Sequence, residues 1–485
     1  MTNQGFYIPD VDVVFDIFKQ INSIPRPSHH EERIADFLCD FARQHSLEYK
    51  RDGRNCVVIR KKATPGYESA EPIVVLNHMD MVCVGMDNPL QDEVKAFVED
   101  GWMKARGTSL GADNGIGLSM ALAMLADDNI VHGPVEVLTT TNEEDGMSGA
   151  EGLEADFING RKVINLDSED YNTITTGAAG ALIQEHRLPA QCVEAPGGKR
   201  RWYHIKVSGG KGGHSGVDIN KGRASAVVHA WALLAAIYNE YDLELADIRV
   251  GEANASIASS ADIVITVPSG EPAEFVKQQE DIFNEWVMDE YGETDPGIKC
   301  HIEKVRPGSH VIGHDAFHKL MVCLEQIPQG VIKMSDTMEG TVETSNNVGR
   351  VFIEDGNIVV TTHTRSFIDD EMRRVADEIK EAFAVEGASS TTIMEAPAWQ
   401  ENQNSKFLTD TSDVFDQVLG WRPKMVAMHF VLEAGYLVAK YPGMQIASIG
   451  PRIVEPHSTS ERLEVSTVGD IWKVFITMLH KFANS

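Results

Sequence analysis

The stretch VVLNHMDMV, Val74 to Val82, begins as a buried strand and then carries two polar side chains, His78 and Asp80. A continuous run of β-branched and aliphatic residues is typical of an inner strand of an α/β sheet. Residues i and i+2 of a strand point to the same face, so these two side chains leave the sheet together. One of them can therefore bind a ligand while the other orients it.

Further strands and helices are expected around this segment. Apolar residues at helical spacing predict a helix from Asp10 to Ile24, and S-H-H-E from Ser28 predicts a capping box for a second helix. A helix is also predicted over 118–128. Short β-branched runs predict strands over 56–60, 72–76, 135–141 and 162–167. Such alternation favours a three-layer α/β domain with a mixed, mainly parallel sheet that helices cover on both faces.

The sequence pattern changes after about Leu188, where a second unit is expected. Asp355 and Gly356 are the turn signal of a hairpin in this unit. The predicted elements are a strand over 201–207, a helix over 222–241, a strand over 255–267, a helix over 271–287, the hairpin over 348–365 and a helix over 370–383. Mixed strands with helices on one side describe an α+β domain.

The α/β pattern returns after about Ala396. It predicts a helix over 430–438, a strand over 444–450 and a helix that Ser466 caps and that ends at Phe482. The simplest arrangement is a catalytic α/β domain made of residues 1–187 and 397–485, with the α+β domain of residues 188–396 inserted between them.

Composition excludes several classes of protein. Of the 485 residues, 43 are Lys or Arg and 73 are Asp or Glu, which gives a formal net charge of −30. This excess repels phosphate backbones and anionic lipids, so neither nucleic acid nor membrane is an expected partner. A span of roughly 18 apolar residues and a signal peptide are both missing, which favours a cytoplasmic protein. The six cysteines lack CxxC spacing and fit reduced thiols.

Acidic and imidazole side chains follow several predicted strands. Open α/β sheets bind ligands at the carboxyl ends of their strands. The candidates are His78 with Asp80, Asp113, the acidic run over 139–146, Asp167 and His457. Each alone fits a helix cap, a surface histidine or a solvated turn. Together, two histidines and several carboxylates without cysteine suit Zn²⁺, Mn²⁺ or Co²⁺, and they exceed what one tetrahedral ion needs. Two ions that share a carboxylate would use them all.

The order of these segments resembles the aminoacylase and dipeptidase family of di-zinc metallopeptidases. The segments are HMD (78–80), GTSLGADNGIG (107–117), TNEEDGMSGA (141–150), NLDSED (165–170), GGKGGHSGVDI (209–219) and PHSTSER (456–462). The likeness runs nearly from end to end, and within the family it is greatest to bacterial dipeptidases that favour a C-terminal histidine. Spaced motifs in this order are far more specific than any one of them alone.

The resemblance implies a ligand set and a second-shell partner. One zinc ion would be held by His78, Asp113 and Asp167, and the other by His457, Asp113 and Glu144, with Asp113 as the bridge. The carboxylate of Asp80 would accept the second ring N–H of His78 and fix its tautomer.

The same resemblance assigns the general base to Glu143, beside the ligand Glu144. Three acids are consecutive here, so Glu144 as base with Asp145 as ligand stays an alternative. The first register is preferred because the following G-M-S-G-A then aligns with a small-residue turn of the family.

In the inserted domain, which the resemblance identifies as a lid and dimerisation domain, His214 would help to stabilise the oxyanion, often from a partner subunit. Arg365 would pair with the free carboxylate of the substrate. Other residues that resemble segments lining the family's pocket are Asn346, Asn347, His429 and Glu433.

The resemblance therefore implies hydrolysis of dipeptides, with a preference for Xaa-His, through a hydroxide that bridges two metal ions. A homodimer through the lid is also expected. The alternatives are a tripeptidase, an N-acyl amino acid deacylase, or a catalytically silent binding or assembly protein. A nucleotide site in the glycine-rich segment 107–117 is disfavoured, because it lacks the Lys and Ser/Thr of a phosphate loop and has Asp113 at its centre.

Overall fold

The chain forms two compact units in the structure, a computed structural model that describes residues 6–270, 273–400 and 405–484. The first unit contains residues 1–177, 401–427 and 433–485, and the second contains residues 178–400 and 428–432. The domain boundaries expected at 187/188 and 396/397 stay predictions.

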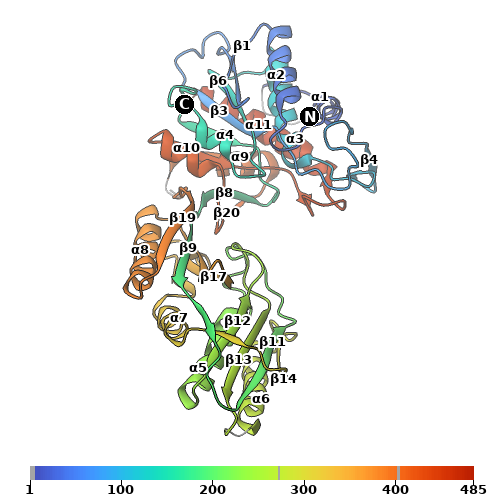
Figure 1. The fold of residues 1–485 in the computed structure, drawn as a ribbon. Helices are drawn as coiled ribbons and strands as arrows, with labels where there is room; N and C mark the ends of the chain where they lie inside the picture. Colours follow the sequence, from blue (N-terminus) through green and yellow to red (C-terminus); the bar gives the residue numbers. More distant parts are fainter. Residues whose placement is uncertain (1–5, 271–272, 401–404, 485) are drawn as a thin grey trace. The chain divides into compact units, whose positions relative to one another are not determined.

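The first unit is built on one large sheet. Its strands are β1 (Glu48–Arg51), β2 (Val57–Lys61), β3 (Ile73–His78), β6 (Val135–Thr140), β7 (Lys162–Asn165), β8 (Thr173–Ala178), β20 (Lys424–Met428) and β21 (Gln445–Ser448). Their order is β1-β2-β6-β3-β7-β21-β8-β20. Figure 1 labels β1, β6, β3, β8 and β20 of this sheet. The central strands β6, β3, β7 and β21 are parallel, whereas β1, β2 and β8 join antiparallel at the sides. The mixed α/β sheet is confirmed.

Helices and a small second sheet complete this unit. The helices are α1 (Asp12–Asn22), α2 (Glu32–Gln44), α3 (Ala112–Ala126), α4 (Ser148–Gly152), α9 (Lys406–Leu419), α10 (Ala434–Lys440) and α11 (Val465–Ala483). The small sheet contains β4 (Ala96–Glu99), β5 (Trp102–Ala105), β22 (Ile453–Val454) and β23 (Arg462–Glu464) in the order β22-β23-β5-β4.

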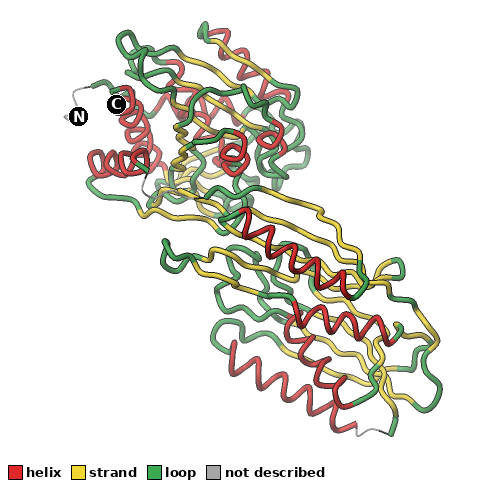
Figure 2. Tube along the Cα trace, turned by 90° about the vertical axis from the view of Figure 1, so that its left-hand side faces the viewer, coloured by secondary structure: helices red, strands yellow, loops and turns green. Residues whose placement is uncertain are grey.

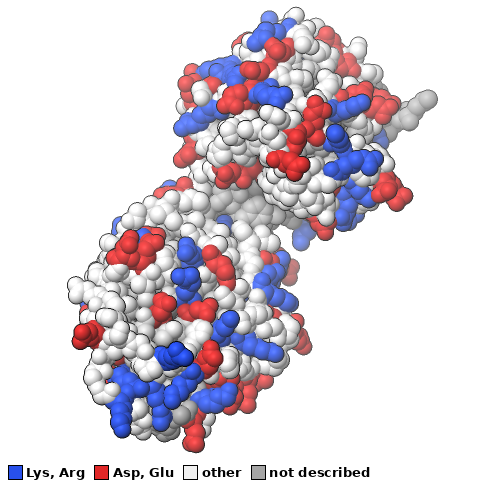
Figure 3. Space-filling view, turned by 45° about the vertical axis from the view of Figure 1, so that its right-hand side comes forward, with Lys and Arg blue, Asp and Glu red and all other residues white. Residues whose placement is uncertain are grey.

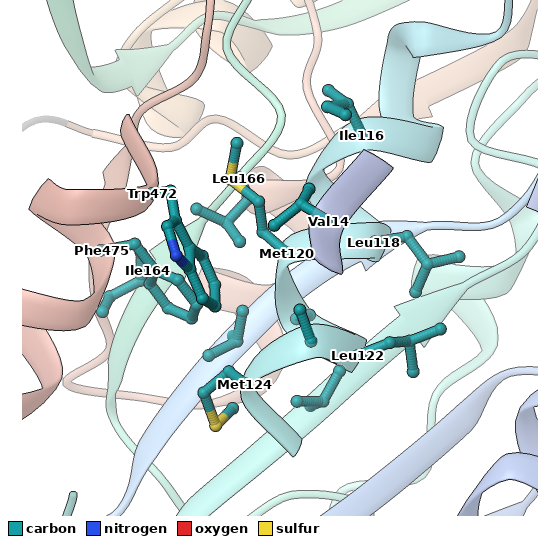
Figure 4. Close-up of a cluster of buried hydrophobic side chains, with 14 of the residues drawn as sticks. Val14, Ile116, Leu118, Met120, Leu122, Met124, Ile164, Leu166, Trp472 and Phe475 are labelled. Atoms are coloured by element: carbon teal, nitrogen blue, oxygen red, sulfur yellow. The ribbon is translucent and has the colours of Figure 1, made fainter. Parts of the chain in front are cut away.

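The core of the first unit is continuous across the sheet and its helices. Helix α3 is apolar on almost every side and is buried accordingly. Figure 4 draws part of this core, where Val14 of α1, Met120 of α3, Ile164 of β7 and Trp472 of α11 belong to one cluster of buried side chains. Helix α3 is thereby fixed in position, which matters because Asp113 lies at its start.

Three local predictions in the first unit are wrong. Ser28 does not cap α2, because the helix begins four residues later, at Glu32, and the Ser28 hydroxyl donates to the Asp80 carboxylate, at 2.8 Å. Helix α11 begins at Val465, so Ser466 lies inside its first turn. The helix expected over 430–438 begins at Ala434, because residues 428–432 leave this unit and pack with the second one.

The second unit is an α+β domain with a nine-stranded sheet. Its strands are β9 (Gly180–Pro189), β11 (Arg200–Ser208), β12 (Glu244–Val250), β13 (Ala261–Pro268), β14 (Lys299–Val305), β16 (Gly330–Met334), β17 (Val342–Glu354), β18 (Asn357–Ser366) and β19 (Ser389–Ala396). They run in the order β14-β11-β13-β12-β17-β18-β9-β19, with β16 beside β17. The short strands β10 (Cys192–Glu194) and β15 (His310–Ile312) form a separate pair.

Four helices pack on this sheet: α5 (Ala226–Glu240), α6 (Ala273–Tyr291), α7 (His314–Gln326) and α8 (Asp369–Val385). Figure 2 shows the helices of this unit running along one side of its strands. The hairpin of β17 and β18 turns at Asp355 and Gly356, both with positive φ, as predicted. The strand expected over 255–267 begins only at Ala261, and the helix expected over 271–287 begins with two residues outside the described ranges.

Side chains of both charge signs are interspersed on the face shown in Figure 3. No helix in the described part of the chain is long and apolar enough to span a bilayer.

Candidate metal centre

The parallel strands β3, β6 and β7 bring the acidic and imidazole candidates of the first unit to one edge. His78 ends β3 opposite Thr140 of β6, and Asn165 ends β7 beside them. The candidate side chains lie at these ends or in nearby loops: His78, Asp80, Asp113, Glu143, Glu144, Asp167 and His457. The sheet therefore collects residues that are up to several hundred positions apart.

Asp113 stands between the two histidines. Its Oδ1 lies 3.0 Å from Nε2 of His78, and its Oδ2 lies 3.2 Å from Nε2 of His457. Asp167 Oδ1 is 3.3 Å from the same His78 nitrogen, and Glu144 Oε2 is 2.8 Å from the same His457 nitrogen. The donor atoms thus form two groups that share one carboxylate.

This arrangement fits a cation. The buried Oε1 of Glu144 has no hydrogen-bond partner among the described residues, and the buried Oδ1 of Asp167 has only its ion-pair contact with His78. Donor atoms of His78, Asp113 and Glu144 all lie within 4.8 Å of one another. Unpartnered buried carboxylate oxygens are costly unless a positive charge meets them. Nitrogen and oxygen donors without sulfur suit Zn²⁺, Mn²⁺ or Co²⁺.

The electrostatics of the centre also favour a bound cation. Burial lowers the pKa of His78, but the surrounding carboxylates Asp167, Asp113 and Asp80 outweigh it and raise that pKa well above its usual value. Hydrogen bonds with Asp113 and Glu144 raise the pKa of His457 to about 11. The carboxylates therefore hold positive charge at both imidazoles, and a bound cation would supply it in place of protons.

Asp80 lies on the other side of the His78 ring. Its Oδ1 is 3.5 Å from Nδ1 of His78, which leaves Nε2 facing Asp113. The same carboxylate accepts the backbone N–H groups of Glu143 and Glu144, at 3.1 and 3.2 Å. It therefore contacts both the ring and the acidic loop.

The three consecutive acids of that loop have different surroundings. Burial raises the pKa of Glu143 well above its usual value, and the negative charges of Asp167 and Glu433 add to the effect. Glu144 contacts His457, as described above. The Asp145 side chain is 74% exposed and lies 2.9 Å from Nε2 of His29. Asp145 thus pairs outside the cluster.

Comparison with known proteins identifies the family. Residues 74–481 match peptidase family M20/M25/M40. The chain belongs to this family. It is 34% identical to the cytosol non-specific dipeptidase of Escherichia coli strain K12 over 473 residues, which cover 96% of each chain. The resemblance found in the motifs is confirmed, and the chain is a peptide-bond hydrolase.

Solved structures match over the whole length of this M20 peptidase. The aminoacylhistidine dipeptidase of Vibrio alginolyticus has a TM-score of 0.90 and 32% identity, with 98% of both chains covered. The aminopeptidase PepT of Bacillus cereus has a TM-score of 0.62 and 16% identity, with 98% of this chain and 99% of that chain covered, which is a likeness of fold alone.

In the first unit of the peptidase, Glu433 is also buried, with its carboxylate beside Thr140 at the end of β6. Burial raises its pKa to about 8, against the lowering effect of the Thr140 hydroxyl, which donates to Oε2 at 2.7 Å, and the negative charges of Asp167 and Asp80 add smaller increases. Its Oε1 is buried without a partner among the described residues.

In the second unit, His214 and Arg365 lie together. Nδ1 of His214 accepts the backbone N–H groups of Gly216 and Val217, each at 3.1 Å, so the neutral ring carries its proton on Nε2. That Nε2 is 3.5 Å from Nη2 of Arg365. Arg365 is 3% exposed and has no ion-pair partner among the described carboxylates. The Nε2–H of His214 and the guanidinium of Arg365, which are both donors, therefore lie together without a described acceptor between them.

The other predicted residues of this unit make contacts within the protein. Asn346 donates to the carbonyl of Pro328 at 2.7 Å, and Asn347 donates to that of Ser256 at 2.8 Å. His429 Nε2 lies 2.7 Å from the Ser345 hydroxyl, and burial lowers its pKa to about 3. These side chains are held in the region of Arg365, whose charge contributes to that low pKa.

Sequence reasoning missed several groups of the centre. Burial raises the pKa of Glu169 to about 7, and the charges of Asp113 and Glu144 add to it, so it belongs to the same acidic interior. Ser28, as noted, donates to Asp80. Glu169 follows Asp167 within the strand-end run already singled out, so proximity in sequence was an available signal. Ser28 offered none, since its contact is 52 residues away.

A second group of donors, Asp242, Glu244 and His314, lies in the second unit. Arg200 already pairs with Asp242, with Nη1 3.0 Å from Oδ2. His314 Nδ1 is 3.5 Å from Glu244 Oε1. This group is satisfied as an ion-pair network.

Proposed function

We propose that this M20 peptidase hydrolyses dipeptides in a metal-dependent reaction and prefers a C-terminal histidine. The observation that carries the proposal is Asp113, whose two oxygens face His78 and His457 beside the buried Oε1 of Glu144, which has no hydrogen-bond partner among the described residues. The names of the relatives, a cytosol non-specific dipeptidase and an aminoacylhistidine dipeptidase, support the substrate class.

Two Zn²⁺ ions, or Mn²⁺ or Co²⁺, are the proposed cofactors. His78, Asp113 and Asp167 would hold one ion; His457, Asp113 and Glu144 would hold the other. When bound, such a pair lowers the pKa of water toward neutrality and polarises a peptide carbonyl.

Glu143 is the proposed general base. Burial raises its pKa toward the working range of a group that must take a proton and later return it. It would accept a proton from the attacking water and pass it to the leaving amine. The surroundings of Asp145, exposed and paired with His29, support this register over Glu144 as base with Asp145 as ligand.

Residues of the second unit are proposed to bind the substrate. The Nε2–H of His214 would donate to the oxygen that becomes negative as the carbonyl is attacked. Arg365, buried without a partner among the described carboxylates, would bind the free carboxylate of the dipeptide. Residues proposed to line the pocket are Asn346, Asn347, His429 and Glu433. The unpartnered Oε1 of Glu433 can accept a hydrogen bond from the substrate's amino group.

The same proposal includes three further points that come from the family resemblance. The second unit would act as a lid, it would form the surface of a homodimer, and the protein would be cytoplasmic.

The deciding experiment measures metal content and hydrolysis on the same preparation, before and after chelation. We expect about two ions per chain, loss of activity with the metal, and its return on adding Zn²⁺. The substrates to compare are carnosine, Gly-His, Leu-Gly, a tripeptide and N-acetyl amino acids. Faster cleavage of the tripeptide or the N-acetyl compounds would replace the proposed substrate. Full activity after complete removal of metal would overturn the proposed chemistry.

A further inference from the structure

A buried carboxylate holds the loop that leads to Asp113. Glu461 is 3% exposed and accepts three consecutive backbone N–H groups through its two oxygens. The N–H groups of Leu110 and Gly111 donate to Oε2 at 2.7 and 3.0 Å, and that of Ala112 donates to Oε1 at 2.8 Å. Glu461 lies four residues after His457 in PHSTSER. One side chain thus joins the loops of two proposed ligands.

A buried guanidinium holds the same loop from the other side. Arg26 is 1% exposed, and its Nη2 donates to the carbonyl of Gly111 at 2.7 Å. Its Nη1 donates to the carbonyls of Met79 and Asp80, at 3.2 and 3.0 Å. These two residues directly follow His78. Arg26 therefore joins the segment of the third proposed ligand to the Asp113 loop.

Gly111 is the point where the two charges meet. Its N–H donates to Glu461 and its carbonyl accepts from Arg26. Its φ is 65°, and a Cβ there would lie 2.5 Å from Nη2 of Arg26. A glycine is required by both the backbone conformation and the close approach of the guanidinium.

Stability alone does not account for this arrangement. Burying two opposite charges costs several kcal/mol of desolvation, and well-packed apolar side chains often serve a core at least as well. Every hydrogen bond described here for Arg26 and Glu461 goes to backbone beside a proposed metal ligand. What the pair fixes is therefore the relative position of three ligand segments.

We propose that Glu461 and Arg26 are positioning residues, which preorganise His78, Asp113 and His457 for the metal pair through Gly111. The inference rests on the metal site of the proposed function, but not on its substrate. Groups behind metal ligands typically contribute about 10- to 100-fold in metal affinity.

The test is the affinity of the metal-free chain for Zn²⁺ alone, measured against a competing chelator. Glu461→Gln replaces one acceptor oxygen by an amide that can only donate, so at least one N–H of residues 110–112 loses its partner. We expect Zn²⁺ affinity about 10- to 100-fold below that of the wild type. Glu461→Asp and Arg26→Lys, which keep the charge but shorten or simplify the contact, should lie between.

Glu136 supplies the matched control. It is a buried carboxylate of the same unit, 4% exposed, and it accepts the N–H groups of Asn159 and Gly160 at 2.7 and 2.8 Å. It sits at the start of β6, at the opposite end from Thr140. Glu136→Gln and Glu461→Gln should both lower the unfolding temperature, but Glu136→Gln should leave Zn²⁺ affinity unchanged.

Two results would overturn the inference: folded variants at Glu461 and Arg26 with wild-type Zn²⁺ affinity, or an equal loss of affinity in Glu136→Gln. If Glu461→Gln does not fold, the Asp and Lys variants decide in the same way. A wild type that binds two ions but leaves dipeptides intact would remove the proposed substrate and keep the inference.

Discussion

The Asp80 carboxylate lies 3.5 Å from Nδ1 of His78, on the side of the ring away from Asp113. It also receives the backbone N–H groups of Glu143 and Glu144 and the hydroxyl of Ser28. One fully buried carboxylate thus connects the strand end that carries a proposed ligand with the loop that carries the proposed base. Its hydrogen bonds should matter for both.

Asp80→Asn tests this connection. The amide keeps one acceptor oxygen and replaces the other with a donor, so the ring or the acidic loop loses an interaction. We expect kcat to fall about 10- to 100-fold and metal to be lost more readily on dialysis. Asp127→Asn is the control, because Asp127 accepts hydrogen bonds from Asn129 on the exposed surface. Unchanged kcat and metal content in Asp80→Asn would contradict the role.

Substitution of the three consecutive acids, one at a time, separates base from ligand. Glu143→Ala should reduce kcat by about 10²- to 10⁴-fold while metal content stays near that of the wild type. Glu144→Ala should lose metal, because Glu144 contacts His457 in the cluster. Asp145→Asn should change neither, since Asp145 is exposed and pairs with His29. Metal loss from Glu143→Ala would reverse the assignment.

The sequence could predict that the candidate ligands lie close together, because parallel strands place the residues at their carboxyl ends along one edge of the sheet. His78 ends β3 and Asp167 comes two residues after β7, and because these strands pair in parallel, both side chains lie at one edge of the sheet. The hairpin turn at Asp355 and Gly356 could also be predicted, because an Asp-Gly pair readily adopts the positive φ angles that this turn requires.

The remaining features depend on contacts between distant segments. Ser28 has the pattern of a helix cap, but α2 begins four residues later, and the Ser28 hydroxyl donates to the carboxylate of Asp80, 52 residues away in the sequence. Glu461 contacts residues 110–112 across about 350 positions, which no local pattern records. The apolar periodicity of 430–438 predicts a helix that begins too early, because the residues up to Leu432 pack with the second unit and the helix begins at Ala434.

Arg365→Ala tests recognition of the substrate carboxylate. The guanidinium is buried without a described carboxylate partner, so a free carboxylate in the substrate would satisfy it. We expect KM for dipeptides to rise about 10- to 100-fold, since hydrogen bonds to charged groups are worth about 1.5–3 kcal/mol. Dipeptide amides, which lack that charge, should show little difference between the variant and the wild type. Equal losses on both substrates would contradict the assignment.

His229 should make the second unit sensitive to acid. Its ring is fully buried among Phe283, Trp286 and Tyr291, with centroids 5.9, 4.3 and 5.1 Å away, and neither ring nitrogen has a described partner. Burial lowers its pKa to about 4, against the smaller opposing effects of the negative charges of Glu290 and Asp295.

The sign of the effect follows from which state binds more protons. Between about pH 6.5 and pH 4 the unfolded chain protonates His229 while the folded unit does not, so the free energy of unfolding falls as pH falls through this window. The full loss is on the order of 3 kcal/mol. His229→Phe removes this contribution, so its urea midpoint, followed by tryptophan fluorescence from pH 7 to pH 4.5, should fall less steeply than that of the wild type. His30→Gln, which changes an exposed histidine, should keep the wild-type slope. An unchanged slope in His229→Phe would show that the ring is protonated equally in both states.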